Sequence, residues 1–216
     1  CGMRASEGAI EKVVFDDDVR FSVIGGARPT GLCGSALIDA AAELLRRGVV
    51  TPEGRLLPSD EPPGGLPREL RARVRSDGGQ TEFLLAEENG VRVAITQRDI
   101  RELQLAAGAI RAGARILLRE AGIAAADLRS VLIAGGFGSF IRRSNAQRIG
   151  LLPPEVERGR ISYVGNASLN GAKMALLSTE ARRRGERLAL KTRHVQLSED
   201  PNFQMEFAEA MIFPEE

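Results

Sequence analysis

Apolar and polar residues alternate along this chain with periods that switch between strand and helix. Residues 10–26 hold two short apolar runs on either side of three aspartates at 16–18, which predicts a β-hairpin with an acidic turn. Turn chemistry explains these carboxylates better than cation binding does. Residues 29–50 repeat apolar positions at helical spacing before Gly48, which predicts a helix that ends there.

Residues 50–96 interrupt this pattern and form a candidate insertion. Five prolines and several glycines lie between residues 51 and 79, which is typical of a surface excursion. Two alternating apolar runs then flank Asn89 and Gly90, the strongest hairpin signal in the sequence. We therefore expect a Pro/Gly-rich insertion with one hairpin, attached to the main core.

Residues 97–122 give the strongest helix prediction. Thr96 followed by Asp99 is a near match to a capping box. Two apolar stripes continue from there at helical spacing, so we expect this helix to be buried on two sides. The first stripe contains Ile100, Leu103, Ala107, Ile110, Ala114, Leu117 and Ala121, and the second contains Leu105, Ala109, Ala112 and Ile116.

The third face of this helix carries Gln104, Gly108, Arg111 and Arg115. A glycine inside a helix costs about 0.8–1.0 kcal/mol relative to alanine, so Gly108 indicates that something needs the space. Two explanations stay open. One is close packing of another helix, and the other is a flat ligand that lies across Gly108, with Gln104 and Arg111 at its edges.

The stretch "VLIAGGFGSF", residues 131–140, combines an apolar run with a cluster of glycines. It predicts a buried strand followed by a sharp exit, where the backbone passes close to a neighbour. The spacing matches neither G-x-G-x-x-G nor the phosphate-binding P-loop. Gly31 and Gly34 with Ser35, at the start of the first helix, form a second candidate because backbone N–H groups there can hold an anion. A glycine-loosened turn explains them equally well.

The last third of the chain alternates strand and helix. Residues 143–150 predict a short helix, and residues 159–178 predict a strand, a turn and a helix. In the C-terminal extension, residues 180–216, we expect a helix, the strand "HVQLS" and a second helix from Asp200 onward. This order favours an α/β lobe with parallel strand pairing.

Composition narrows the function classes. The 30 basic and 29 acidic residues give no strong positive field, so we do not expect nucleic acid as a partner. No apolar stretch approaches the roughly 20 residues that span a bilayer, so we expect no membrane protein. Two cysteines and one histidine cannot assemble a tetrahedral zinc site, and we expect no metal in this chain. The cysteine usage favours a cytoplasmic protein.

The order of these elements resembles the second lobe of the acetate and sugar kinase, heat-shock chaperone and actin superfamily. The resemblance implies an actin/ribonuclease H-like lobe, a mixed sheet with flanking helices, over residues 1–216, with the insertion at 50–96. In that fold a strand followed by "GG" contacts adenosine, and a long helix covers the adenine. By resemblance, the nucleotide contacts would be Gly135, Gly136, Phe137, Gly138, Gln104, Gly108 and Arg111.

Several longer motifs are similar to the C-terminal part of the reductive activators of corrinoid proteins. This resemblance implies a corrinoid protein as partner and ATP with Mg²⁺ as cofactor, and it leaves a homodimer open. It also implies a 2Fe-2S cluster in an N-terminal region outside this sequence. The motifs are "CGMRASEGAI", "GLCGSALIDA", "ITQRDIRELQLAAGAIRAG", "LIAGGFGSFI", "RIGLLP" and "VGNASLNGAKMALLS".

Two features of the family's pattern are not found in this sequence. The two phosphate loops of the superfamily are expected upstream of Cys1, so we expect no efficient ATP hydrolysis by these 216 residues alone, and the catalytic residues stay unknown. The family's pattern also implies a lysine near Ala107, for which Arg111 is the candidate substitute.

Two other functions stay open. A non-catalytic scaffold with the same fold would bind proteins or dimerise without using ATP. A small-molecule phosphotransferase is disfavoured because no general-base carboxylate is recognisable beside the glycine loop.

Overall fold

A hairpin covered by a helix forms the first part of the molecule. The computed structural model describes residues 2–136 and 140–215. Strand β1 (Ala9–Phe15) pairs antiparallel with β2 (Val19–Val23), which confirms the predicted hairpin. A short strand, β3 (Gly31–Leu32), pairs with β1 in parallel, and helix α1 (Gly34–Arg46) contacts β1.

The insertion forms a three-stranded antiparallel sheet in the order β4-β5-β6. Glu88 pairs with Val91 across Asn89 and Gly90, both of which have positive φ, and this confirms the predicted hairpin and its turn. The first strand of the sheet was not expected, because only one of its residues is a buried apolar residue. The elements are α2 (Arg68–Ala72), β4 (Val74–Asp77), β5 (Gln80–Glu88) and β6 (Val91–Thr96).

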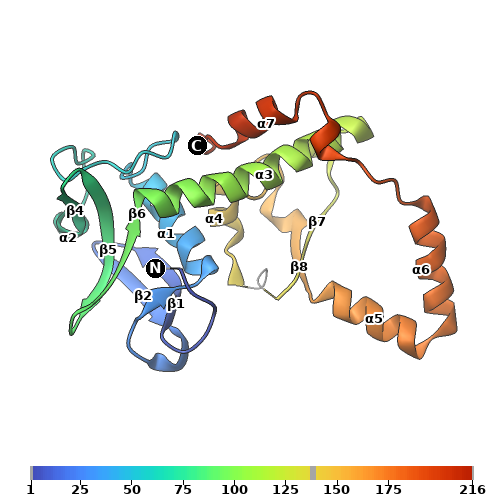
Figure 1. The fold of residues 1–216 in the computed structure, drawn as a ribbon, viewed down its shortest axis with the longest axis horizontal. Coiled ribbons are helices and arrows are strands. Elements are labelled where there is room, and N and C mark those ends of the chain that lie inside the picture. The colour runs from blue at the N-terminus through green and yellow to red at the C-terminus, as the bar shows by residue number, and fades with distance from the viewer. Residues whose placement is uncertain (1, 137–139, 216) are drawn as a thin grey trace.

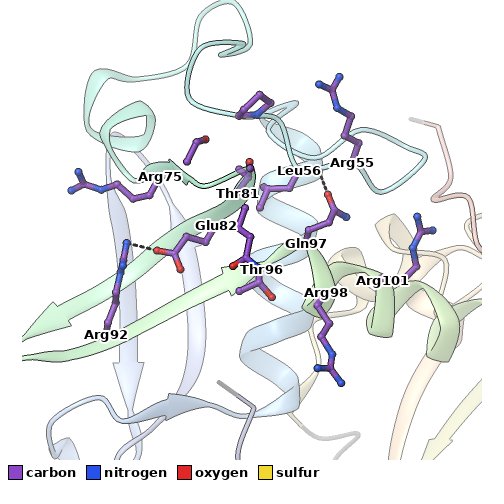
Figure 2. Close-up of a pocket in the computed structure, with 14 residues that line it drawn as sticks. Arg55, Leu56, Arg75, Thr81, Glu82, Arg92, Thr96, Gln97, Arg98 and Arg101 are labelled. Atoms are coloured by element: carbon purple, nitrogen blue, oxygen red, sulfur yellow. Dashed lines mark hydrogen bonds and ion pairs between the residues drawn. The ribbon is translucent and has the colours of Figure 1, made fainter.

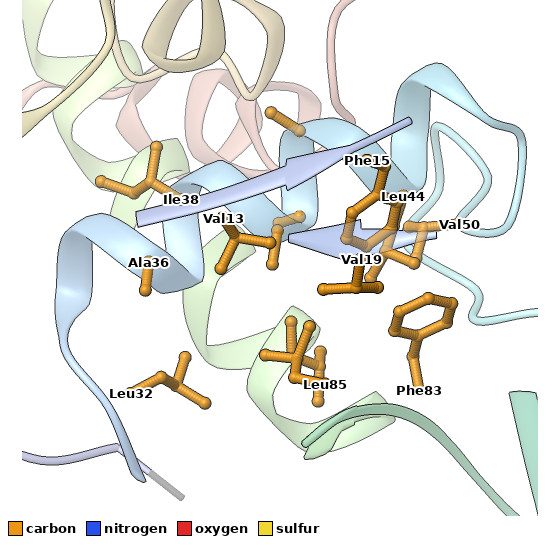
Figure 3. Packing of buried hydrophobic residues seen from close by; sticks show 14 of the residues in the cluster. Val13, Phe15, Val19, Leu32, Ala36, Ile38, Leu44, Val50, Phe83 and Leu85 are labelled. Atoms are coloured by element: carbon orange, nitrogen blue, oxygen red, sulfur yellow. The ribbon is translucent and has the colours of Figure 1, made fainter. Parts of the chain in front are cut away.

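This sheet shares one hydrophobic core with the first hairpin and α1 (Figure 3). The rings of Phe15 and Phe83 stack with their centroids 5.0 Å apart. Leu85 and Ile95 are fully buried in the same cluster as Leu44 of α1. Two stretches of sequence therefore fold as one packed unit, not as a core with a loosely attached excursion.

Helix α3 (Gln97–Ala121) runs across the molecule (Figure 1). The predicted capping box is confirmed: the Thr96 hydroxyl accepts a hydrogen bond from the N–H of Asp99, whose carboxylate accepts one from the N–H of Thr96. The predicted burial of both apolar stripes is wrong in part, because Leu105, Ile110 and Leu117 are exposed. The face with the glycine is buried instead. The buried residues of α3 are Ile100, Gln104, Ala107, Gly108, Ala112, Gly113 and Ile116.

The second part of the molecule is less compact than the first (Figure 1). Strands β7 (Val131–Ala134) and β8 (Ile161–Gly165) pair in parallel, as the sequence predicts. Helix α4 (Arg143–Arg148) lies between them in the chain and contacts α1. Helices α5 (Ala167–Leu177) and α6 (Thr179–Lys191) contain no buried residue and extend away from the rest of the molecule (Figure 1).

The C-terminal segment returns along α3. The predicted strand "HVQLS", residues 194–198, is wrong: residues 194–196 form no strand, and a short 3₁₀ helix begins at Leu197 (Leu197–Glu199). A strand needs a neighbouring strand for its hydrogen bonds, whereas this segment is held by side chains such as the ion pair of Arg193 with Glu120. Helix α7 (Phe203–Ala210) then packs against α3. No described helix has the length and apolarity that a membrane span requires.

Candidate nucleotide site

The glycine loop begins where β7 ends. Gly135 has φ 113°, a conformation that side chains rarely adopt, and its N–H donates a hydrogen bond to the carbonyl of Gly165 at 2.7 Å. A Cβ atom added to Gly136 would meet nothing within 4 Å. The loop therefore presents bare backbone at the carboxyl end of a parallel strand pair, where α/β proteins bind ligands. Phe137 and Gly138 lie outside the described residues.

The N-terminus of α1 faces the same region. The side chain of its N-cap residue, Cys33, accepts no hydrogen bond from the backbone N–H groups of the first turn. The Ser35 hydroxyl instead donates to the carbonyl of Glu11 at 2.8 Å and contacts the Cys33 sulfur at 3.1 Å. The start of α1 thus keeps the positive end of its dipole without a side-chain cap, which suits an anionic group.

One cavity joins these two features. Its volume is about 350 Å³, within the range of about 300–1,000 Å³ that is usual for small-molecule sites. Gly136, Gly34 and Ser35 all line it, although Gly136 is about 100 residues from the other two in sequence. The remaining lining residues are Met3, Arg4, Ala5, Glu11, Ile24, Cys33 and Phe140.

A buried polar cluster fixes the segment that follows the glycine loop. The Asp39 carboxylate of α1 accepts a hydrogen bond from the Asn145 side chain of α4 at 2.7 Å and one from the N–H of Val13 at 3.3 Å. Arg142 forms an ion pair with the same carboxylate at 3.3 Å. Burial raises the pKa of Asp39, while Asn145 and Arg142 act against the shift. The cluster therefore joins α1, β1 and α4 around the loop.

Tyr163 of β8 gives the segment a second attachment. Its hydroxyl donates a hydrogen bond to the carbonyl of Ile141, and the Arg143 guanidinium lies 5.4 Å from the centre of its ring. Burial raises the pKa of this phenol, so it stays a neutral donor at physiological pH.

The other predicted contacts lie elsewhere. Gln104 donates from its side chain to the carbonyl of Met211 at 2.9 Å, and Arg111 donates to the carbonyl of Ile212 at 2.9 Å. A Cβ atom on Gly108 would come within 3.1 Å of the Met211 side chain. The C-terminal segment therefore occupies the face that a flat ligand would need. This favours close packing, not a ligand, as the reason for the glycine at position 108.

The two predicted sets of residues therefore do not meet. Arg111 borders a separate cavity of about 50 Å³, too small for a nucleobase. Burial lowers the pKa of Arg111, and its guanidinium is engaged with the chain itself. Ala107, where the family's pattern implies a lysine, is buried. Nucleotide contacts from Gln104, Gly108 and Arg111 stay predictions that this arrangement does not favour.

Sequence reasoning missed most of the cavity lining, including Met3, Arg4, Glu11 and Phe140. The N–H of Met3 donates to the carbonyl of Leu32 at 2.9 Å, which anchors the N-terminal segment beside the start of α1. No local pattern around Arg4 signals this contact between distant segments. Phe140 is the exposed aromatic after the glycine loop, which the sequence shows without saying what it faces.

Comparison with known proteins agrees with this architecture. The corrinoid activation enzyme RamQ of Eubacterium limosum is 39% identical over 207 residues, which cover 94% of this chain and 34% of RamQ. The [Co(II) methylated amine-specific corrinoid protein] reductase of Methanosarcina barkeri is 34% identical over 88 residues, 41% of this chain and 16% of that protein. A solved structure of a reductive activator for corrinoid, iron-sulfur protein is similar with a TM-score of 0.83 at 36% identity, covering 98% of this chain and 33% of that one.

The chain spans about a third of the length of RamQ and of the solved activator. A family model described as the C-terminal domain of RACo, the ASKHA domain, matches residues 1–216. With the mixed α/β architecture and the likeness of both sequence and structure, this match is decisive, and the chain belongs to that family of ASKHA domains.

Proposed function

We propose that this chain is the nucleotide-binding and partner-docking lobe of an ATP-dependent reductive activator. Such a protein returns an inactive corrinoid cobalt from Co(II) to Co(I) by supplying one electron. The relatives' names, a corrinoid activation enzyme and a Co(II) corrinoid protein reductase, support the partner and the direction of the reaction. A cytoplasmic location goes with this role.

The cavity between Gly136 and the start of α1 carries the proposal. Gly136 has no side chain, and a Cβ atom placed there would meet nothing within 4 Å, so a flat adenosine can approach its backbone closely. The start of α1, with its Gly34 and Ser35 N–H groups, is suited to a phosphate, and Arg4 adds a positive charge on the same cavity. The chain's part is to bind and orient the nucleotide.

The other expected groups fit this chain unequally. Mg²⁺ usually binds through one or two carboxylates together with substrate phosphates, and Glu11 is a carboxylate on the cavity. A 2Fe-2S cluster needs four protein ligands, whereas the sequence has two cysteines and one histidine. The cluster therefore does not fit these residues, and the electron source belongs to another part of the protein or to a partner.

Substitution of Gly136 tests the nucleotide site. Gly136→Val places a branched side chain in open space without straining the backbone, because this glycine does not have positive φ. We expect the fold to survive and ATP affinity, measured by calorimetry with the full-length protein, to fall about tenfold or more. Gly64→Val is the matched control, since its added side chain also meets nothing within 4 Å. Equal ATP affinity in both variants would overturn the assignment.

One observation favours a second candidate, a protein-binding or dimerising scaffold. Helix α5 exposes Leu169, Met174, Leu176 and Leu177, an apolar surface typical of protein interfaces. Docking of a corrinoid protein with the same affinity in the presence and absence of ATP would support the scaffold. Docking that ATP changes severalfold would support the activator.

A further inference from the structure

A wide groove lies in the insertion, away from the candidate nucleotide site. Its volume is about 1,060 Å³, and it is bounded by the loop around Leu56, by residues of β4, β5 and β6, and by the first turns of α3 (Figure 2). None of its lining residues belongs to the cavity at Gly136. Nothing in the proposed function uses it.

The charge on the groove is strongly unequal. Its described lining includes five arginines and a single carboxylate, that of Glu82. This imbalance is local, because the whole chain has 30 basic and 29 acidic residues. The arginines are Arg55, Arg75, Arg92, Arg98 and Arg101.

Some of these charges are compensated and others are not. Arg55 holds Glu61 through two hydrogen bonds, at 2.9 and 3.0 Å, and Arg92 pairs with Glu82. Arg101 donates to the neutral amide of Gln104 at 3.1 Å. Among the described side chains, no carboxylate forms an ion pair with Arg75 or Arg101, and Arg98 reaches Glu102 only at 3.9 Å. An excess of solvated positive charge therefore remains along the groove.

The wall of the groove is held in place. The Gln97 side chain accepts a hydrogen bond from the N–H of Leu56 at 2.8 Å and donates one to the carbonyl of Gly54 at 2.6 Å. These bonds attach the loop to the start of α3. The groove exists before any partner arrives, which lowers the cost of ordering on binding.

The arginines surround the groove without converging on one point. Figure 2 shows Arg75 and Arg92 on the sheet side, with Arg55, Arg98 and Arg101 spread over the loop and the helix. A single phosphate is bound by donors that meet at one place, which this arrangement does not provide. An extended segment with several separated carboxylates matches it better.

We propose that this groove binds a carboxylate-rich segment of a partner protein, by charge complementarity along its length. The contact is independent of the nucleotide cavity and adds a docking site to the molecule. Because the arginines are solvent-exposed, the association weakens as salt rises.

The test uses a fluorescent synthetic peptide in which glutamate and aspartate alternate with serine. Its binding to the full-length protein is followed by anisotropy at about 0.02 M and about 0.3 M salt. The groove variant is Arg75→Glu with Arg98→Glu. The matched control is Arg183→Glu with Arg184→Glu, which removes the same charge from exposed positions on α6. Thermal unfolding verifies that each variant is folded, and Arg75→Gln with Arg98→Gln replaces the groove variant if it is not.

We expect the wild type and the control to bind within a factor of about two of each other, and the groove variant to bind about tenfold or more weakly at low salt. A companion peptide with glutamine and asparagine in place of the acids should not bind. Equal loss in both charge variants would show nonspecific attraction and overturn the proposal. So would no peptide binding at all, or binding of inorganic tripolyphosphate alone with the same sensitivity to the groove variant.

Discussion

The core around β1, α1 and β5 and the arm formed by β7, β8, α5 and α6 both carry apolar side chains, which are largely buried in the core and, apart from Ile161, intermediate or exposed in the arm. Phe15, Phe83 and Leu44 are almost completely buried. In the arm, the side chains of Leu177 and Leu190 are 84% and 89% exposed. The difference teaches that apolar content predicts burial only where another element of the same chain lies opposite.

The contacts between elements account for this contrast in burial. The hairpin β1-β2, the insertion sheet and α1 lie on facing surfaces and close around one cluster (Figure 3). Strands β7 and β8 pair only with each other in the described structure, and α5 contacts mainly α6. The arm therefore depends on local hydrogen bonds and caps, such as the Asn166 side chain that accepts from the N–H of Leu169.

The largest predicted effect is in the core. Phe83→Ala removes a fully buried ring that stacks on Phe15, and we expect it to lower the free energy of unfolding by about 3–5 kcal/mol. Urea unfolding measures the loss. Phe140→Ala is the control because Phe140 is exposed, and it should change stability by less than about 0.5 kcal/mol. Similar losses in the two variants would remove the contrast between core and surface.

The next effect concerns the joint between the two regions. Asp39→Ala leaves Asn145, Arg142 and the N–H of Val13 without their buried carboxylate, and we expect a loss of about 3 kcal/mol. Hydrogen exchange of the folded Asp39→Ala variant should then be faster in α4 and the glycine loop than in β5. Uniform exchange throughout the molecule would contradict a role confined to the joint.

The same residue predicts a pH dependence. Because burial raises the pKa of Asp39, the folded state binds this proton more tightly than the unfolded state. Its contribution to stability is greatest below the ordinary aspartate pKa and declines as pH rises through the raised value. Asp39→Asn cannot titrate, so the stability of the wild type relative to this variant should fall over that pH range. A constant or rising difference in urea unfolding would contradict the sign.

Much of the fold could be predicted from local signals. The turn at Asn89 and Gly90, the capping box at Thr96 and the parallel strands around the glycine loop depend on residues close in sequence. The burial of α3 could not be predicted in the same way. Its two apolar stripes are partly exposed, whereas Met211, about 100 residues away, covers the face with Gly108.

For the candidate site too, single residues could be predicted from local signals, but their neighbours in space could not. Gly136 and Ser35 each carried a local signal, and only the tertiary structure shows that they border one cavity. From sequence, Gln104 and Gly108 matched an expected ligand face as well as Gly136 did. Their actual neighbour is the C-terminal segment, which no pattern near them announces.

The third effect tests that covering segment. Gly108→Val adds atoms where a Cβ already lies 3.2 Å from the N of Met211 and 3.3 Å from the carbonyl carbon of Ala210, so we expect a loss of about 1–3 kcal/mol. Limited proteolysis should cut the C-terminal segment sooner. Ala109→Val is the control on an exposed position of the same helix and should cost only about 0.5 kcal/mol through helix propensity. Equal proteolysis in the two variants would show that the segment does not depend on Gly108.

The smallest effect belongs to the arm and sharpens the comparison most. Leu177→Ser and Leu190→Ser change side chains that touch little of this chain, so each should alter the free energy of unfolding of these 216 residues by less than about 0.5 kcal/mol. A loss near that of Phe83→Ala would mean that the arm packs against the core in solution. Little or no change would mean that these leucines do not stabilise the fold they belong to, so their apolar character must be explained by contacts beyond it.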